Sequence, residues 1–160
     1  MRPTVRGLAS AVALALVAAG PAAAERVDVT AMDGVQLIAE LSGTSGPGVV
    51  LVADADPARW PAVADAIAAR GFRVLRLDLR GHGASAGPAE LAAADRDIEG
   101  AYRYLLGRKI RPVFLLGTAG TAAAARAVAT RVPTAGVEVV GSDEDVASVV
   151  RRLRNHEATP

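Results

Sequence analysis

Short apolar runs alternate with longer amphipathic runs along most of the chain. Polar and apolar side chains alternate over residues 26–31 and 35–41, on either side of Asp33-Gly34. This pattern predicts an antiparallel hairpin with a two-residue turn. Four further strands, mostly apolar and therefore expected to be covered on both faces, are predicted at 48–53, 72–77, 112–117 and 136–140.

Amphipathic segments lie between the later strands. Their spacing predicts helices at 60–70, 89–106, 121–132 and 143–154. In the second helix, Leu91 and Ile98 belong to the apolar face, and the polar face is expected to carry Arg96, Asp97, Glu99 and Arg103. Strands joined by single helices favour right-handed crossovers. We therefore predict an α/β three-layer sandwich, with a mostly parallel sheet of about six strands and an N-terminal antiparallel hairpin, in one domain over residues 25–160.

The first 24 residues have the pattern of a signal peptide. Arg2 and Arg6 are followed by an apolar run at 8–19, a Gly20-Pro21 break and the small residues 22–24. The run is short for a bilayer span, which takes roughly 20 apolar residues. An uncleaved anchor helix is the alternative. We predict an exported protein, periplasmic or secreted, with no stable membrane anchor after cleavage.

Charge and composition limit the classes of ligand and partner that we expect. The chain has 18 basic and 17 acidic residues, and loss of Arg2 and Arg6 would leave 16 against 17. That balance gives no electrostatic footprint for nucleic acid. There is no cysteine, and the two histidines are far apart in sequence, so we predict neither a metal site nor a cofactor. The expected partner is an unknown small molecule or protein.

One passage carries a family resemblance. Residues 69–85, ARGFRVLRLDLRGHGAS, resemble the "A-R-G-Y-x-V-x-x-x-D-x-R-G-H-G-x-S" passage of the α/β-hydrolase superfamily, in its lysophospholipase and serine-peptidase-like branch. Residues 97–106 are similar to the helix before the family's nucleophile strand, and 113–117 take the position of that strand. The resemblance covers residues 30–130 and implies a shortened core of that fold, with hydrolysis of ester or amide bonds as the family's activity.

The nucleophile turn departs from the family. Its G-x-S-x-G elbow is replaced by Gly117-Thr118-Ala119-Gly120-Thr121, and Ala119 has no nucleophilic atom. Thr118, Thr121 or Ser85 are alternative nucleophiles, although Thr121 also suits the N-cap of the next helix. A strand-to-helix turn of this kind could also bind a small anion through Gly117, Thr118, Gly120 and Thr121.

The oxyanion side of the resemblance is altered as well. Where the family has His-Gly, this chain has Ala53-Asp54-Ala55-Asp56. A carboxylate there would oppose a developing oxyanion, and ordinary turn chemistry before Pro57 is the alternative. Ala55 is a candidate binding residue at this position.

Candidates for the acid and the base lie near the C-terminus. Residues 141–146 are faintly similar to the family's acid-bearing loop, in which Asp143, Glu144 or Asp145 could serve. A capping box between Ser142 and Asp145 explains the same residues. His156 is the candidate base, but we expect a solvated side chain in a polar tail.

These observations favour an exported hydrolase-like domain without serine-hydrolase activity that acts by binding or interaction. Two alternatives stay open: a divergent esterase or peptidase that uses Thr118, Thr121 or Ser85, and a small anion-binding domain at the 117–121 turn. An exposed sheet edge could be covered by a partner or by a second copy, which would make a homo-oligomer.

Cleavage after Ala24 is the first testable prediction. Protein recovered from the exported fraction should begin at Glu25 by intact mass spectrometry, because residues 22–24 supply the small side chains that signal peptidase requires. Recovery of the full-length chain from the cytoplasm would contradict it.

Overall fold

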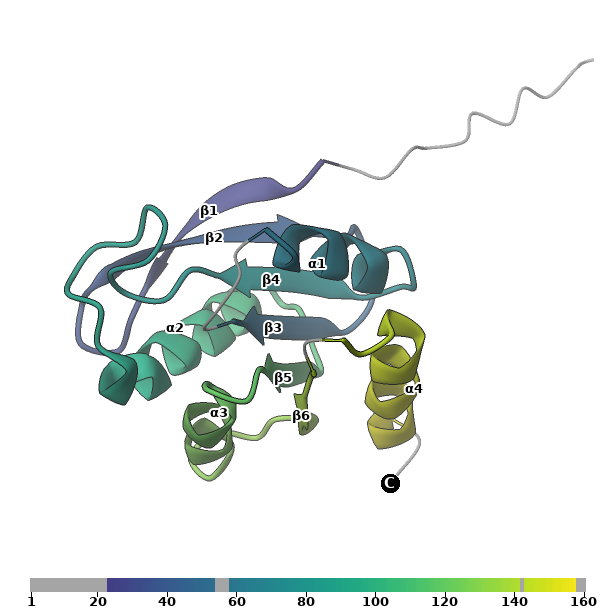
Figure 1. The fold of residues 1–160 in the computed structure, drawn as a ribbon. Helices are drawn as coiled ribbons and strands as arrows, with labels where there is room; N and C mark the ends of the chain where they lie inside the picture. The colour runs from purple at the N-terminus through teal and green to yellow at the C-terminus, as the bar shows by residue number, and fades with distance from the viewer. Residues whose placement is uncertain (1–22, 54–57, 142, 158–160) are drawn as a thin grey trace, which may run out of the picture.

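A six-stranded mixed sheet forms the centre of the protein. The computed structural model describes residues 23–53, 58–141 and 143–157. The strands are β1 (Glu25–Thr30), β2 (Gln36–Ser42), β3 (Gly48–Val52), β4 (Arg73–Leu77), β5 (Val113–Gly117) and β6 (Gly136–Val139). The helices are α1 (Trp60–Ala68), α2 (Ala94–Gly107), α3 (Ala122–Ala129) and α4 (Val146–Glu157), with a 3₁₀ turn η1 (Leu91–Ala93) before α2 (Figure 1).

The sheet has the order β1-β2-β4-β3-β5-β6. The pairs β1–β2 and β2–β4 are antiparallel, whereas β4–β3, β3–β5 and β5–β6 are parallel. The prediction of a mostly parallel sheet of six strands with an N-terminal antiparallel hairpin is therefore confirmed. Because the four parallel strands run the same way, the loops after β3, β4, β5 and β6 leave from one end of the sheet.

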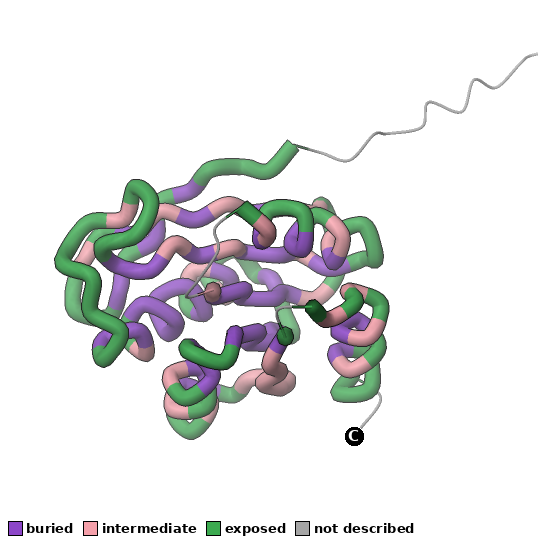
Figure 2. Tube along the Cα trace, in the orientation of Figure 1, coloured by how far each residue is buried: buried purple, intermediate pink, exposed green. Residues whose placement is uncertain are grey.

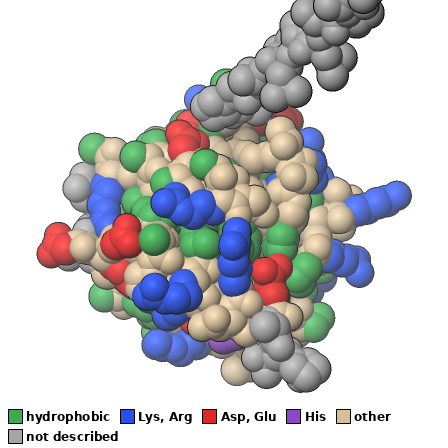
Figure 3. All heavy atoms as spheres, turned by 90° about the vertical axis from the view of Figure 1, so that its right-hand side faces the viewer, with side chains coloured by type: hydrophobic (Ala, Val, Ile, Leu, Met, Phe, Trp, Pro, Cys, Tyr) green, Lys and Arg blue, Asp and Glu red, His purple; other side chains and the backbone are tan. Residues whose placement is uncertain are grey.

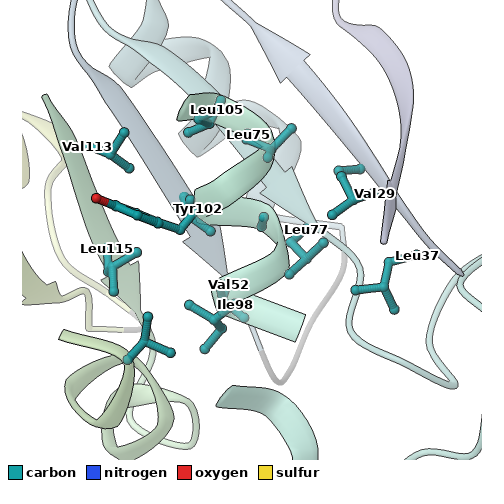
Figure 4. Close-up of a cluster of buried hydrophobic side chains, with 14 of the residues drawn as sticks. Val29, Leu37, Val52, Leu75, Leu77, Ile98, Tyr102, Leu105, Val113 and Leu115 are labelled. Atoms are coloured by element: carbon teal, nitrogen blue, oxygen red, sulfur yellow. The ribbon is translucent and has the colours of Figure 1, made fainter. Parts of the chain in front are cut away.

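Helices cover both faces of the sheet, as a three-layer sandwich requires. In β3, Val50 and Val52 belong to the core under α2 and α3, while Val49 and Leu51 belong to the core under α1 and α4. This is the period-two alternation of a strand buried on both sides. Figure 4 shows the first of these cores, where Tyr102 of α2 lies among aliphatic side chains of the sheet. Figure 2 shows buried residues along the central strands and on the inner sides of the helices.

The hairpin turn is longer than predicted. The strands end at Thr30 and restart at Gln36, which are paired, so the loop has five residues instead of the two-residue Asp33-Gly34 turn. The Ala31 N–H donates to the Val35 carbonyl at 2.9 Å and closes the loop. Asp33 is turned toward the body of the protein, where it meets Arg80.

Helix boundaries also differ from the predictions. α2 begins at Ala94 instead of residue 89, and Leu91, expected on its apolar face, is 54% exposed in η1. α3 is shorter than 121–132, and α4 lies three residues later than 143–154. None of the helices within these ranges is long and apolar enough to cross a membrane.

The polar face expected for α2 is partly wrong, because two of its carboxylates are buried. Asp97 is fully buried and Glu99 is 7% exposed. Glu99 receives hydrogen bonds from Arg103 Nη2 at 2.8 Å and Arg131 Nε at 3.1 Å. These guanidinium groups, that of Arg103 first, lower the pKa of the Glu99 carboxyl below its usual value.

Arg80 joins three separate segments through a buried ion-pair cluster. Its backbone N–H and its guanidinium both donate to the Asp97 carboxylate, with Nη2 at 2.6 Å from Oδ1. The other guanidinium N–H groups donate to Asp33 at 2.9 and 3.0 Å. The hydrogen bond from Arg80, helped by Arg96, lowers the pKa of Asp33 to about 2. The hairpin loop, the loop after β4 and α2 are therefore held at one point.

Loss of Arg80 should destabilise the fold strongly. Arg80→Met leaves the Asp97 carboxylate buried without its cation, so we expect the free energy of unfolding to fall by about 3–5 kcal/mol in urea denaturation. Arg96→Gln is the matched control, because Arg96 pairs with Asp33 from a side chain that is 58% exposed, and it should cost at most about 1 kcal/mol. Equal losses in the two variants would contradict the central role of Arg80.

Candidate functional site

The turn after β5 is the one that the sequence resemblance matches to the nucleophile elbow. Gly117 ends β5 and pairs with Val52 of β3, and α3 begins at Ala122. Ala119 and Gly120 are exposed, while Thr118 and Thr121 are buried. In the described ranges, Lys109 is the only residue other than glycine with a positive φ. The backbone of Ala119 is therefore not in the strained left-handed conformation. The turn has the place of an elbow, with a methyl group at its tip.

Thr121 uses its hydroxyl to hold the turn. Its Oγ1 accepts a hydrogen bond from the Thr118 N–H and donates to the Val52 carbonyl, each at 2.9 Å. The side chain is fully buried. Thr121 stands at the N-cap position of α3, but its side chain makes no cap hydrogen bond, so the expected capping role is wrong. A nucleophile would need a hydroxyl accessible to substrate, and this one bonds within the protein.

A glycine is required beneath this hydroxyl. A Cβ on Gly117 would lie 2.9 Å from Thr121 Oγ1, closer than real contacts allow. The absence of a side chain at Gly117 therefore leaves room for the Thr121 hydroxyl to reach the Val52 carbonyl of β3.

Thr118 is also buried and lies within the same network. Its Oγ1 is 3.3 Å from Thr121 Oγ1. The N–H groups of Thr121 and Ala122 both donate to the Thr118 carbonyl, at 3.2 and 2.9 Å. Three backbone donors of the turn, those of Thr118, Thr121 and Ala122, thus bond internally, which leaves fewer N–H groups to hold an anion. The candidate binding residue Ala55, with Asp54 and Asp56, lies outside the described residues.

Ser85 has a structural position in the loop after β4. Its Oγ accepts from the Ile38 N–H at 2.8 Å and donates to the Asp78 carbonyl at 2.6 Å. The hydroxyl therefore bridges β2 and the end of β4. In the same loop, the His82 ring lies 3.0 Å from the Arg80 carbonyl, to which Nδ1 can donate.

His156 is exposed, as expected, but it belongs to α4 rather than to a polar tail. Its ring lies 6.3 Å from the Phe114 ring, centroid to centroid. Nε2 is 2.8 Å from Glu138 Oε1. A Cβ on Gly136 would lie 2.9 Å from the His156 ring, so the glycine makes room for it.

This position takes His156 away from the turn. Gly136 pairs with Phe114 at the amino end of the strands, whereas Ala119 follows Gly117 at the carboxyl end. Phe114 and Gly117 are three residues apart, about 10 Å along a strand. His156 lies beside Glu138 and Phe114 instead of facing Ala119.

The candidate acids after β6 are structural or exposed. Glu144 pairs with Arg152, whose Nε donates to Glu138 at 2.6 Å. Arg152 lowers the pKa of Glu144, and its carboxylate partners raise the pKa of Arg152 above its usual range. Asp143 and Asp145 are exposed. Ser142, the other half of the expected capping box, lies outside the described residues; Glu144 Oε2 instead accepts from the Gly141 N–H at 3.2 Å.

The cluster of Glu138, Arg152, Glu144 and His156 was not among the residues predicted from the sequence to lie together. Arg152 and His156, four residues apart on α4, share one helical face and could have been paired with the strand carboxylate. In the part of the chain that the structure describes, no Ser-His-Asp arrangement comes together at the turn. No group of three side chains suited to metal binding was found in that part either.

Comparison with solved structures identifies the class of protein. An esterase of Pyrococcus furiosus superposes with a TM-score of 0.65 and 20% identity, over 86% of this chain and 56% of that one. A thermophilic esterase from Thermogutta terrifontis gives 0.58 and 30%, over 72% and 44%. An epoxide hydrolase from an endophytic Streptomyces gives 0.60 and 25%, over 72% and 36%. No protein-family model and no curated protein matches the chain.

The chain is therefore related to the α/β-hydrolase superfamily, as the sequence resemblance implied. It spans about half the length of several of the hydrolases that it matches. Its described residues form a shortened core of that fold.

Removal of the Thr121 hydroxyl should destabilise the turn. Thr121→Val leaves the Thr118 N–H and the Val52 carbonyl without this partner, so we expect the free energy of unfolding to fall by about 1–3 kcal/mol in denaturant titrations. Thr130→Val is the control, since Thr130 is exposed at the end of α3, and it should change stability by at most about 0.5 kcal/mol. A neutral Thr121→Val would show that the hydroxyl does not hold the turn.

Proposed function

We propose that this hydrolase-like protein acts by binding or interaction and lacks serine-hydrolase activity. The observation that carries the proposal is Ala119 at the tip of the elbow turn, where a nucleophile would have to stand. Without an attacking atom, the acyl-enzyme step has no first bond to form.

The neighbouring hydroxyls support this proposal. Those of Thr121 and Ser85 each donate to a backbone carbonyl and accept from a backbone N–H, and the Thr118 side chain is only 7% exposed. Their use as nucleophiles would require these contacts to break, and a displacement near 1 Å can cost a hundredfold in rate. The position of His156 also supports the lack of activity, because its ring lies against Phe114 and Glu138.

Export to the periplasm or the outside belongs to the same proposal. The sequence pattern of residues 1–24 supports it, and Glu25, the expected first residue of the mature protein, is also the first residue of β1. Cleavage there would leave all six strands of the sheet in the mature chain.

Short-chain p-nitrophenyl esters test catalysis. We expect no turnover above the buffer blank, with a serine esterase as positive control, and no covalent labelling by a fluorophosphonate probe. Oxyanion stabilisation and binding alone can give about 10³–10⁴ over water when triad residues are removed, so the assay must detect rates at that level. Labelling at Thr118, Thr121 or Ser85, lost together with activity on mutation to alanine, would overturn the proposal.

The variant Ala119→Ser tests whether the protein lacks only the nucleophile or also the catalytic base and acid. We expect it to stay inactive, because His156 bonds to Glu138 beside the amino end of the strands and Glu144 is paired with Arg152. Robust ester hydrolysis by Ala119→Ser would mean that a working base and acid reach residue 119 after all.

A further inference from the structure

A basic groove separates α4 from the end of α1. It is a hollow of about 450 Å³ lined by Arg70, Ala147, Val150, Arg151, Arg154 and Asn155. We call it the α1–α4 groove. Figure 3 looks at the side of the molecule on which α4 lies, and Lys and Arg side chains border hydrophobic atoms on this face.

One face of α4 supplies most of the groove. Residues 147, 150, 151, 154 and 155 follow the spacing of three and four that places side chains on the same side of a helix. Ala147 and Val150 give an apolar floor, and Arg151 and Arg154 stand beside it. Arg70, which follows α1 in the chain, forms the opposite wall.

The three arginines are not neutralised by neighbouring side chains. Within the described residues, none of Arg70, Arg151 and Arg154 has a carboxylate at ion-pair distance, whereas Arg80 and Arg152 each pair with two. The guanidinium of each makes a single hydrogen bond within the described residues. Arg154 donates to the Arg70 carbonyl at 2.8 Å, Arg70 to the Ala66 carbonyl at 2.8 Å, and Arg151 to Ser148 Oγ at 3.2 Å. A guanidinium has five N–H donors, so most of theirs point to no partner among those residues.

We propose that the α1–α4 groove binds a small amphiphile with a phosphate or carboxylate head and a short apolar group. A guanidinium can donate two parallel N–H hydrogen bonds to a phosphate or carboxylate. A bound anion would also reduce the repulsion among the three positive charges. The apolar floor and a volume within the range of small-molecule sites fit a short hydrocarbon chain. Because Arg70 precedes β4, the groove lies toward the amino end of that strand, away from Ala119, and the proposal does not depend on the elbow being inactive.

Calorimetric titration of the intact protein tests this site. The probes are n-butyl phosphate and hexanoate, with inorganic phosphate and n-butanol as the separated halves, all at one ionic strength. We expect saturable binding of at least one amphiphile, tighter than binding of either half. Arg151→Gln and Arg154→Gln should each raise its Kd at least tenfold. The control variant Arg126→Gln alters an exposed arginine on α3 and should leave Kd unchanged.

Three results would overturn the proposal. They are no saturable binding of either amphiphile, inorganic phosphate binding as tightly as butyl phosphate, and equal weakening in Arg126→Gln. Circular dichroism of each variant distinguishes lost binding from lost folding, and amide shifts of Ala147 and Val150 in NMR titrations locate the ligand independently of the substitutions.

Discussion

The buried guanidinium of Arg80 is the contact on which the arrangement of the sheet and α2 depends. It lies at the carboxyl end of β4, and it bonds to Asp97 of α2 and to Asp33 of the hairpin loop. A buried cation with two carboxylates is costly to desolvate, and its geometry must be satisfied in full to be tolerated. These three segments can therefore take few relative positions, which gives the antiparallel hairpin a fixed place beside the parallel strands.

A second network controls the carboxyl end of β5. In the superfamily this place belongs to a reactive serine, but here Thr121 sends its hydroxyl back to Val52 in the neighbouring strand. The glycine at 117 makes that approach possible. The turn still connects a strand to a helix, as in a hydrolase, but the Thr121 hydroxyl makes hydrogen bonds within the protein.

The sequence predicted the layers well and the polar interior poorly. Strand positions follow from apolar periodicity, which depends on neighbouring residues alone, so β3, β4 and β5 lie close to their predicted ranges. The burial of Asp97 could not follow from the same rule, because a binary pattern assigns every carboxylate to the surface and the partner Arg80 is 17 residues away. The bond between Thr121 and Val52 spans 69 residues, and no local pattern contains it.

At the candidate site, the motif showed that alanine replaces the nucleophile at residue 119, but it did not show which side chains lie around His156. His156 looked like part of a polar tail, since Asn155 and Glu157 flank it. Its place against Phe114 depends on Gly136, which leaves space for the ring from a strand 20 residues earlier. Contacts of this kind arise only when two elements meet, so the sequence could name the residue and not its environment.

The hold of Arg152 on β6 makes the two borders of the sheet unequal. Arg152 Nη2 donates to the Val139 carbonyl at 3.0 Å, and the same guanidinium is fixed by Glu138 and Glu144. A backbone acceptor on this border is thereby capped by a side chain, one of the ways in which proteins prevent edge-to-edge pairing. β1, on the opposite border, is a six-residue strand with four exposed residues. A strand added beside β6 would have to displace the Arg152 guanidinium from the Val139 carbonyl, a cost that addition beside β1 would not carry.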